Sequence, residues 1–441
     1  MNELPSNLPS GETRPVRSSR RKFFLSIIIG FAVLVVGLVV SLIVVRSQNI
    51  ARMERIRQVA AQHQFTLHLG TSFYLPPDYE PYLGWLRPYV ADYFEEIQFI
   101  SLDELTADLP PTFFDDLSHF HRIGSIHWLI PRHSKEIVGL LRHQQQLYAC
   151  DFAPRNLQDE DLECISQSPY LHSLYMNGLE SKDVKGRFLK AAAAAPLDTL
   201  TLHMVNLDDA GCQAIGRLKT LQHLDLSGCE LNSESAKAFT GLSSVIYLTV
   251  DDTAVDDQFG ATLGALPALE HLSVEGTLLT EQGLQHLEHC RVLSQLYTDG
   301  KRGGPELLAH LCHCVRLKSV DIVWSGKFSA SEMANFNALP DLTYLYFSDI
   351  GDSEAAHLLQ CKHLTRLDIH SSRMTSVGVG SLMQLPDLRH LKLAGKEWGP
   401  ELVEVLYESP TLETVKILDR EWEWWQFEDL REGLRAQSGL K

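Results

Sequence analysis

Apolar residues recur along the chain in the pattern L-x-x-L-x-L, which repeats many times after residue 93. Fourteen units share this pattern and begin at Phe94, Ile123, Leu147, Leu171, Leu197, Leu221, Val245, Leu269, Leu293, Leu317, Leu342, Leu364, Leu388 and Leu412. Neighbouring starts are 22 to 29 residues apart, most often 24. Side chains alternate between the two faces of a strand, so the second and third apolar residues point the same way. Each unit therefore predicts one short strand with one buried face.

A helix is predicted in the second half of each unit. Six units carry a helix-capping residue eleven positions after their start, at Asp208, Asn232, Asp256, Thr280, Ser353 and Thr375. Side-chain oxygens at such positions accept hydrogen bonds from the free N–H groups of a first helical turn. Apolar residues at helical spacing follow, as at Leu284 and Leu287. One strand and one helix in about 20–29 residues is the pattern of leucine-rich repeats.

The predicted fold is therefore α/β. We expect a right-handed leucine-rich-repeat solenoid, or horseshoe, with a parallel sheet on the concave side and helices on the convex side. One unit cannot bury its own apolar face, so the repeats must stack and each end needs a cap.

The repeats resemble the leucine-rich repeat superfamily of the ribonuclease-inhibitor-like horseshoe type. The unit Leu269 to Leu284 and the segment Trp85 to Phe99 are similar to those of membrane-anchored leucine-rich repeat proteins of planctomycete bacteria. The resemblance spans about residues 50–418 and brings no catalytic motif with it. The first three units depart from the pattern, and Lys301 to Pro305 replaces the usual turn and cap. We expect an altered loop there.

Residues 23–45 form a run of 23 residues without a charge. A helix of this length spans about 34 Å, enough for a hydrocarbon core of about 30 Å. The apolar part of a cleaved signal peptide is shorter, so we interpret the run as an uncleaved transmembrane helix, a signal-anchor. Three basic residues, Arg20, Arg21 and Lys22, touch its N-terminal end, and Arg46 touches the other. This favours a single-pass protein of the inner membrane with a cytoplasmic N-terminus and a periplasmic C-terminal domain.

The predicted organisation has five parts. A basic cytoplasmic tail (1–22) precedes the transmembrane helix (23–45), a linker helix with an N-terminal cap (46–93), the repeats (94–418) and an aromatic C-terminal cap (419–441). In the N-terminal cap we expect a helix from Gln48 to Gln62 and a strand from Phe65 to Leu69. Acidic neighbours of Trp422, Trp424 and Trp425 favour a cap over a membrane-interface segment.

The charge distribution limits the kinds of partner. The chain carries 39 Lys and Arg against 56 Asp and Glu, a net charge of −17. Residues 1–57 hold nine basic and three acidic residues, so the remainder holds 30 against 53. Phosphate backbones repel so acidic a domain, and we predict no nucleic-acid partner.

Cysteine and histidine are candidates for disulfides and metal ligands. Of the eight cysteines, Cys290, Cys314 and Cys361 each lie three residues before a repeat start, where other units have leucine. We expect buried free thiols, with a disulfide as the alternative. His310, Cys312, His313 and Cys314 are the densest group of potential ligands, but inward cysteines and outward histidines do not converge on one ion. Neither Gly378-Val-Gly380 nor Gly326-Lys327 completes a phosphate-binding motif, so no metal or cofactor is expected.

The outward strand and turn positions of the middle repeats are acidic, aromatic and histidine-bearing. They include Tyr247, Asp251, Asp252, His271, Glu275, Tyr297, Asp299, Asp321, Trp324, Tyr344, Tyr346, Asp368 and His370. Aromatic rings with charged rims are typical of protein-binding surfaces; the alternative is an ordinary solvated sheet face. His271 with Asp251 or Glu275 could form an acid/base pair, but an open sheet excludes little water, so we predict no enzyme.

The sequence therefore predicts a membrane-anchored module for protein interaction or ligand recognition, which binds a partner with a basic patch through the concave face. The alternative is a structural spacer or adhesion element of the cell envelope. A hydrolase has the least support.

Overall fold

The structure is a computed structural model of the chain. It describes residues 17–63, 66–71, 95–102, 108–130, 132–144, 146–178, 182–396, 398–417, 420–423, 426–430 and 432. The chain divides into two compact units. The first comprises Met1–Gln64, Thr71–Glu95 and Leu109–Leu117, and the second comprises Phe65–Gly70, Glu96–Asp108 and Ser118–Lys441.

The first unit contains helices α1 (Arg17–His63) and α4 (Pro111–Leu117), which pack together. The predicted helices at 23–45 and 48–62 are parts of one continuous helix of 47 residues. Near its end Met53 and Ile56 are buried, and the Arg55 guanidinium donates to both carboxylate oxygens of Asp116 at 2.7 and 2.5 Å.

The predicted membrane span lies within α1. In the part of the chain that the structure describes, no helix is both long enough and apolar enough to cross a membrane. The structure therefore does not support the transmembrane helix at 23–45, which stays a prediction from the sequence.

The second unit is built around the sheet, whose sixteen strands lie in chain order from β1 to β16. The strands are β1 (Thr66–Thr71), β2 (Glu95–Leu102), β3 (Ser125–Trp128), β4 (Ala149–Phe152), β5 (Ser173–Asn177), β6 (Thr199–His203), β7 (His223–Asp225), β8 (Tyr247–Thr249), β9 (His271–Ser273), β10 (Gln295–Gly303), β11 (Ser319–Trp324), β12 (Tyr344–Ser348), β13 (Arg366–His370), β14 (His390–Ala394), β15 (Thr414–Ile417) and β16 (Arg420–Glu423). Strands β2 to β15 pair in parallel, which confirms the predicted α/β leucine-rich-repeat solenoid.

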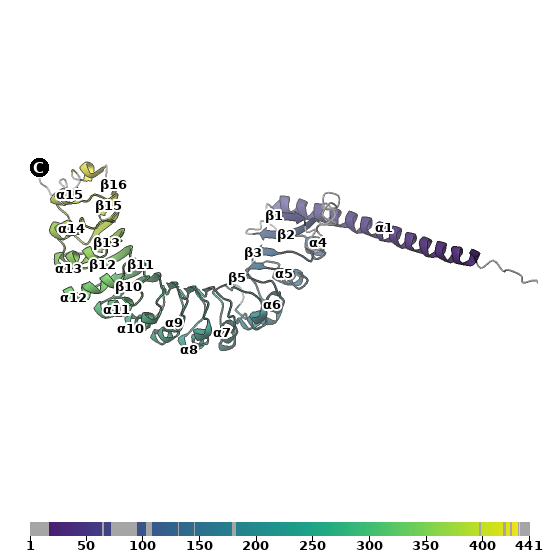
Figure 1. Cartoon of the computed structure of the whole chain (residues 1–441), viewed down its shortest axis with the longest axis horizontal. Coiled ribbons are helices and arrows are strands. Elements are labelled where there is room, and N and C mark those ends of the chain that lie inside the picture. The colour runs from purple at the N-terminus through teal and green to yellow at the C-terminus, as the bar shows by residue number, and fades with distance from the viewer. Residues whose placement is uncertain are drawn as a thin grey trace, which may run out of the picture. The chain divides into compact units, whose positions relative to one another are not determined.

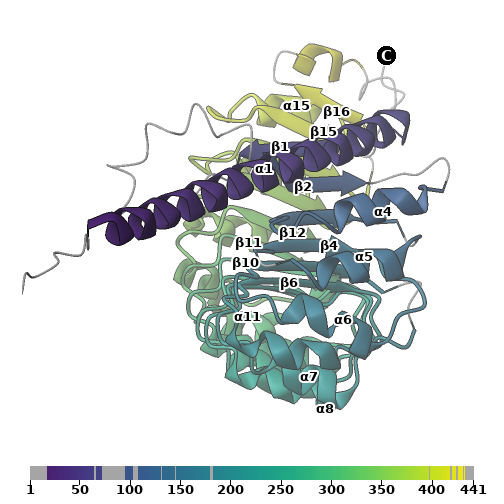
Figure 2. The same cartoon turned by 90° about the vertical axis from the view of Figure 1, so that its right-hand side faces the viewer.

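Short helices connect successive strands and lie on the side of the repeats opposite the sheet (Figure 1). The α-helices are α5 (Ser134–Leu141), α6 (Asp159–Ser166), α7 (Asp209–Ile215), α8 (Ser233–Ala236), α9 (Gly260–Gly264), α10 (Glu281–Leu284), α11 (Pro305–Leu311), α12 (Ala330–Met333), α13 (Asp352–His357), α14 (Ser376–Leu382) and α15 (Glu401–Leu406). The 3-10 helices are η3 (Arg187–Ala194), η4 (Lys237–Gly241), η5 (Asp257–Phe259), η6 (Gln285–His289), η7 (Ala334–Ala338) and η8 (Leu358–Gln360). Figure 2 shows α5 to α8 following one another beside the strands.

The core follows the apolar pattern of the sequence. Leu224, Leu248, Leu272 and Leu296 occupy the second apolar position of four units and pair in one register across β7 to β10. Each of these leucines has 2% or less of its surface exposed. Every strand therefore adds one row of side chains to a continuous core.

The turn after a strand uses left-handed backbone. Asp252 and Gly276 occupy equivalent positions in neighbouring units, with φ of 53° and 62°. A Cβ atom on Gly276 would lie 2.2 Å from Oδ1 of Asp252, so the stacked turns leave no space for a side chain there. Glycine is favoured at that site by both its conformation and its size.

Five of the six predicted helix caps are confirmed. The side chains of Asp208, Asn232, Asp256, Thr280 and Thr375 each accept a backbone hydrogen bond from the first turn of a helix. The prediction for Ser353 is wrong, because this residue lies inside α13 and Gly351 is the cap. That unit is two residues shorter than the common period, so its helix begins two positions earlier.

Acidic residues that follow the caps join neighbouring repeats. Asp257 accepts from the backbone N–H groups of Thr280 and Gly283 in the next unit, at 2.7 and 3.0 Å. Asp352 makes the same contacts with Thr375 and Gly378, at 2.8 and 3.1 Å. Each carboxylate satisfies N–H groups that a helix start would otherwise leave free, so it stabilises the stacking of two repeats.

The predicted altered loop of the 293 unit is confirmed. Strand β10 continues to Gly303, and its register with β11 shifts between Tyr297 and Arg302. Gly304 then serves as the helix N-cap, with Pro305 as the first helical residue.

Both ends of the sheet differ from the repeats. At the N-terminal end, β1 covers most of the strand predicted at 65–69, and Phe65 lies outside the described residues. At the other end, β16 pairs with β15 in antiparallel orientation. Phe427 and Leu430 are buried, as expected for a cap, whereas Trp424 and Trp425 lie outside the described residues.

Candidate functional site

The solvent-facing side chains of β2 to β15 form one surface, which we call the strand face. At its middle, the Tyr247 ring lies between two histidine rings from the adjoining strands. Its centroid is 5.4 Å from that of His223 and 4.2 Å from that of His271, with interplanar angles of 28° and 4°. In-register parallel pairing causes this stacking, because equivalent positions of neighbouring strands lie side by side.

Carboxylates cluster around these rings. Asp251 is held in place because its side chain accepts from Ser273 Oγ at 2.9 Å and from the Glu275 backbone N–H at 2.7 Å. Asp299 accepts from the backbone N–H of Gly276 at 3.0 Å. We call Asp225, Asp251, Glu275, Asp299 and Asp321, which come from five successive units, the acidic stretch.

The electrostatics of the acidic stretch follow from burial and crowding. Burial raises the pKa of Glu275 above its ordinary value, and the charges of Asp251, Asp321 and Asp299 raise it further. The pKa of Asp251 is raised mainly by burial, against the effect of its two hydrogen bonds. Burial and then the charge of Asp299 raise the pKa of Asp321. Like charges gathered on a half-buried surface favour a cationic partner.

A second aromatic group lies on β12. Tyr344 and Tyr346 are half-buried side chains of the strand face. Burial, with the nearby charges of Asp368 and Asp321, raises the pKa of Tyr344 to about 12. The Arg366 guanidinium lies over the Tyr344 ring at 5.1 Å from its centroid.

Most residues predicted for this surface reach it. Tyr247, Asp252, Tyr297, Asp299 and His370 are exposed, and Asp251, His271, Glu275, Asp321, Tyr344 and Tyr346 are half-buried. The prediction for Trp324 is wrong, because none of its surface is exposed and its ring contacts Phe336 edge to face. Strand β11 continues through Trp324, so alternation turns Val323 outward and the tryptophan inward.

Asp368 was also predicted to contact a partner, but its carboxylate is not available for this. Its side chain is buried and accepts from Nε and Nη2 of Arg366 at 3.3 and 3.2 Å. This carboxylate neutralises a neighbour on its own strand, so it offers little charge to a partner.

Sequence reasoning missed several residues of the strand face. One ring nitrogen of His203 lies 3.3 Å from the Tyr175 hydroxyl oxygen, and the other lies 3.1 Å from a carboxylate oxygen of Asp225. His223 and Asp225 stand at the same positions of their unit as His271 and Ser273, so the repeat register would have found them. The same register identifies Lys392 and Lys416 on the last two parallel strands.

Residues 199–420 match the family described as leucine-rich repeat region. The chain belongs to the leucine-rich repeat family. Among solved structures, an internalin of Listeria monocytogenes is similar, with 13% identity over 76% of this chain and 94% of its own, and a TM-score of 0.53. A leucine-rich repeat protein of Leptospira interrogans shows 16% identity over 70% and 92% of the two chains, with a TM-score of 0.43. No curated protein matches the chain.

At this identity the internalin shows the fold alone. Leucine-rich repeat folds generally mediate protein interactions, and their proteins are typically not enzymes.

All eight cysteines of this leucine-rich repeat protein are free. Cys290, Cys314 and Cys361 are buried as predicted, and burial raises the pKa of each thiol to about 12. Such thiols stay protonated and unreactive at neutral pH. His310 pairs with Glu288 at 2.7 Å, and the described part of the chain has no group of three side chains placed to hold a metal ion.

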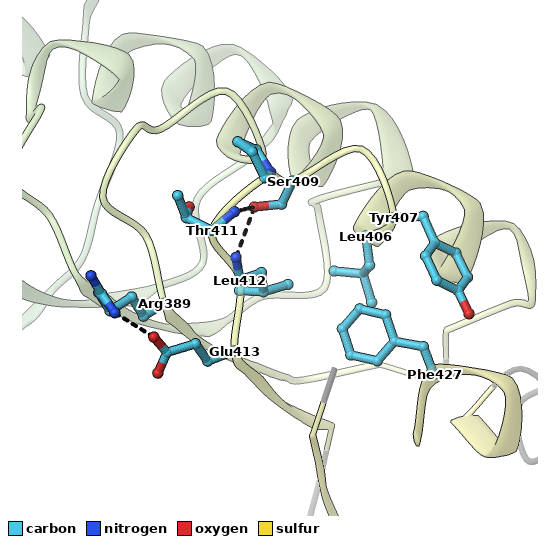
Figure 3. Close-up of a pocket in the computed structure, with 9 residues that line it drawn as sticks. Arg389, Leu406, Tyr407, Ser409, Thr411, Leu412, Glu413 and Phe427 are labelled. Atoms are coloured by element: carbon cyan, nitrogen blue, oxygen red, sulfur yellow. Dashed lines mark hydrogen bonds and ion pairs between the residues drawn. The ribbon is translucent and has the colours of Figure 1, made fainter. Parts of the chain in front are cut away.

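A cavity of about 500 Å³ lies among residues 389–427, near the last strands of the sheet (Figure 3). Its polar groups are used internally: Arg389 pairs with Glu413, and the Ser409 hydroxyl accepts from the backbone N–H groups of Thr411 and Leu412. Leu406, Leu412 and the rings of Tyr407 and Phe427 form its apolar wall. The cavity presents no acid/base pair and is part of the packing of the cap.

Proposed function

We propose that this leucine-rich repeat protein binds a protein partner through the middle of the strand face, and that the partner presents a basic patch. The observation that carries the proposal is the charge of the face from β4 to β12. Its strands and the turns after them bring carboxylates to solvent from Asp151, Asp225, Asp251, Asp252, Glu275, Asp299 and Asp321. Among the described residues of that stretch, Lys301 and Arg302 of β10 are cations, and the Lys301 ammonium donates to the Val274 and Thr277 carbonyls and to Asp299.

The rings beside the acidic stretch suit the same partner. Tyr247 is 43% exposed and stacked on both sides, so its position is set before binding. Arginine side chains stack on aromatic faces and pair with carboxylates, which this surface offers together. Preorganised aromatic anchors of this kind lose little conformational entropy when a partner docks.

The experiment uses a fluorescein-labelled deca-lysine peptide and the full chain in a non-ionic detergent. Glu275→Gln with Asp321→Asn removes two charges, and among the described residues neither carboxylate accepts a hydrogen bond. We expect the dissociation constant, measured by fluorescence anisotropy at low salt, to rise about tenfold, since each such contact contributes roughly 0.5–1 kcal/mol.

The matched control places the same changes on exposed helix residues, as Glu163→Gln with Glu306→Gln on α6 and α11. This control should change affinity less than about twofold. Equal losses in the two variants would indicate a diffuse charge effect and remove the support for recognition by the strand face. The spacer or adhesion role would then be the better account.

Binding of deca-lysine should also release protons at weakly acidic pH. Burial and repulsion raise the pKa values of Asp251, Glu275 and Asp321, so these carboxyls take up protons at a higher pH than ordinary Asp and Glu, at about 3.9 and 4.3. A bound cation favours the charged form, lowers these pKa values and expels the protons. Deca-lysine should therefore bind more weakly at about pH 5 than at about pH 7.5 and release protons only at the lower pH.

Calorimetry in two buffers of different ionisation enthalpy measures this release. Glu275→Gln should reduce it, and Glu306→Gln should not. Proton release that is equal at both pH values would contradict the assignment of these carboxyls to the binding surface.

We further propose that residues 23–45 anchor the protein in the inner membrane, with a cytoplasmic N-terminus and periplasmic repeats. The support is the uncharged run of 23 residues and the denser basic residues before it. Protease added to spheroplasts should digest the repeats, while those in intact cells stay protected by the outer envelope. Digestion only after lysis of the inner membrane would reverse this topology.

A further inference from the structure

The strand face changes its charge after β12. Strands β13, β14 and β15 bring Arg366, Lys392 and Lys416 to solvent, and Asp368 and Lys416 flank Lys392 in the parallel register. From β4 to β12 the face instead carries Asp151 and the acidic stretch. We call Arg366, His390, Lys392 and Lys416 the basic end of the strand face.

The cations of the basic end differ in their partners. Arg366 shares the buried Asp368 carboxylate and keeps 56% of its side chain exposed. Lys392 and Lys416 are half-buried, and neither has a carboxylate partner among the described residues. Glu421, opposite Lys416 in the register of β16, has its side chain outside the described part.

These residues surround a shallow cavity of about 290 Å³. His390 also lines it, with one ring nitrogen 2.9 Å from the Thr414 hydroxyl. Three cations, Arg366, Lys392 and Lys416, line it together with the buried carboxylate of Asp368, which pairs with Arg366. Half-buried ammonium groups without a paired anion favour a negatively charged ligand.

We propose that the basic end is a subsite for an acidic segment of the same protein partner, so that the partner binds in one orientation. This inference rests on the proposed function: the basic patch of the partner lies on the acidic stretch, and its acidic segment lies on β13 to β15. A partner turned end for end would place like charges opposite each other at both places, which is unfavourable.

Charge argues against a second copy of this chain as the occupant. The chain has a net charge of −17, so two copies repel each other over most of their surface. A distinct partner with separated patches of both signs avoids this repulsion.

The test uses two labelled probes, deca-glutamate and deca-lysine, with the full chain in a non-ionic detergent at low salt. Lys392→Glu with Lys416→Glu should weaken deca-glutamate binding at least tenfold and leave deca-lysine binding unchanged or stronger. Arg291→Glu with Lys362→Glu makes the same charge change at exposed residues that precede strands. This control should alter deca-glutamate affinity less than twofold, and thermal melts of both variants verify that they fold.

The outcomes separate the two proposals. If deca-glutamate fails to bind, or loses affinity equally in both variants, while deca-lysine still binds the acidic stretch, the basic-end subsite is overturned and the proposed function stands. A second outcome is that Glu275→Gln with Asp321→Asn leaves the affinity for deca-lysine unchanged, while Lys392→Glu with Lys416→Glu weakens deca-glutamate binding. The proposed function then fails and the anion-binding subsite stands. A wild-type dimer that Lys392→Glu with Lys416→Glu converts to monomer, seen by sedimentation velocity, would make a second copy the occupant and overturn the acidic-segment assignment.

Discussion

Leu272→Arg should unfold the repeats around β9. Leu272 is completely buried and sits in the row of core leucines between Leu248 and Leu296. An arginine there buries a charge without a partner, and the neighbouring strands offer only aliphatic side chains. We expect a loss of about 4 kcal/mol or more in the free energy of unfolding, measured by urea titration with circular dichroism.

Leu278→Arg is the matched control six residues away. Leu278 is 63% exposed, so the same substitution should change stability by less than about 0.5 kcal/mol. If the Leu272 variant melted cooperatively at the wild-type urea concentration, the assignment of the core row would be wrong.

Gly260→Ala should destabilise the stacking of the units that begin at Val245 and Leu269. A Cβ atom at Gly260 would lie 2.3 Å from the Gly283 carbonyl oxygen and 2.7 Å from Cδ2 of His286. The backbones of the two repeats must move apart to make room for the methyl group. The helices of the two repeats then no longer pack closely. We expect a loss of about 2–3 kcal/mol in the free energy of unfolding.

Gly139→Ala should have the opposite effect and increase the free energy of unfolding. Gly139 lies inside α5, and a Cβ atom there would meet no atom within 4 Å. Alanine favours the helical backbone over glycine by about 0.5–1 kcal/mol, so this variant should gain stability. Destabilisation by both substitutions in the same urea titrations would show that helix geometry, rather than contact between repeats, determines the effect at Gly260.

The repeat register could be predicted because one rule recurs. The second apolar position of each unit is buried, and Ile126 pairs with Cys150 although both units are degenerate. The first unit is shifted by three residues from its predicted start at Phe94, because Ile100 rather than Ile97 pairs with Ile126. The caps at Asp208 and Thr280 follow from the same spacing.

Local irregularities could not be predicted in full, because they depend on the length of each turn. The 342 unit is two residues shorter than the common period, so its helix cap is Gly351 and not Ser353. In β11 the strand continued where other units turn, and Trp324 took an inward position. The period of the sequence carries no signal for either change.

The candidate surface was predicted only in part. Outward positions were correctly assigned for Tyr247 and Glu275, since alternation decides them. The stacking of Tyr247 between two histidines and the pairing of Asp368 with Arg366 depend on neighbours in space. Net charge alone also hid the change of sign after β12, which becomes visible only when the strands are aligned in register.

The most direct test of the central claim is carboxylate footprinting of the full chain. Carbodiimide couples glycine ethyl ester to accessible carboxyls, and peptide mass spectrometry reads each site with and without deca-lysine. The account predicts protection of Asp251, Glu275 and Asp321 and unchanged labelling of Glu163 and Glu306 on the helices. Protection of the helix carboxylates, with the acidic stretch labelled as before, would contradict the claim that the strand face binds the cationic partner.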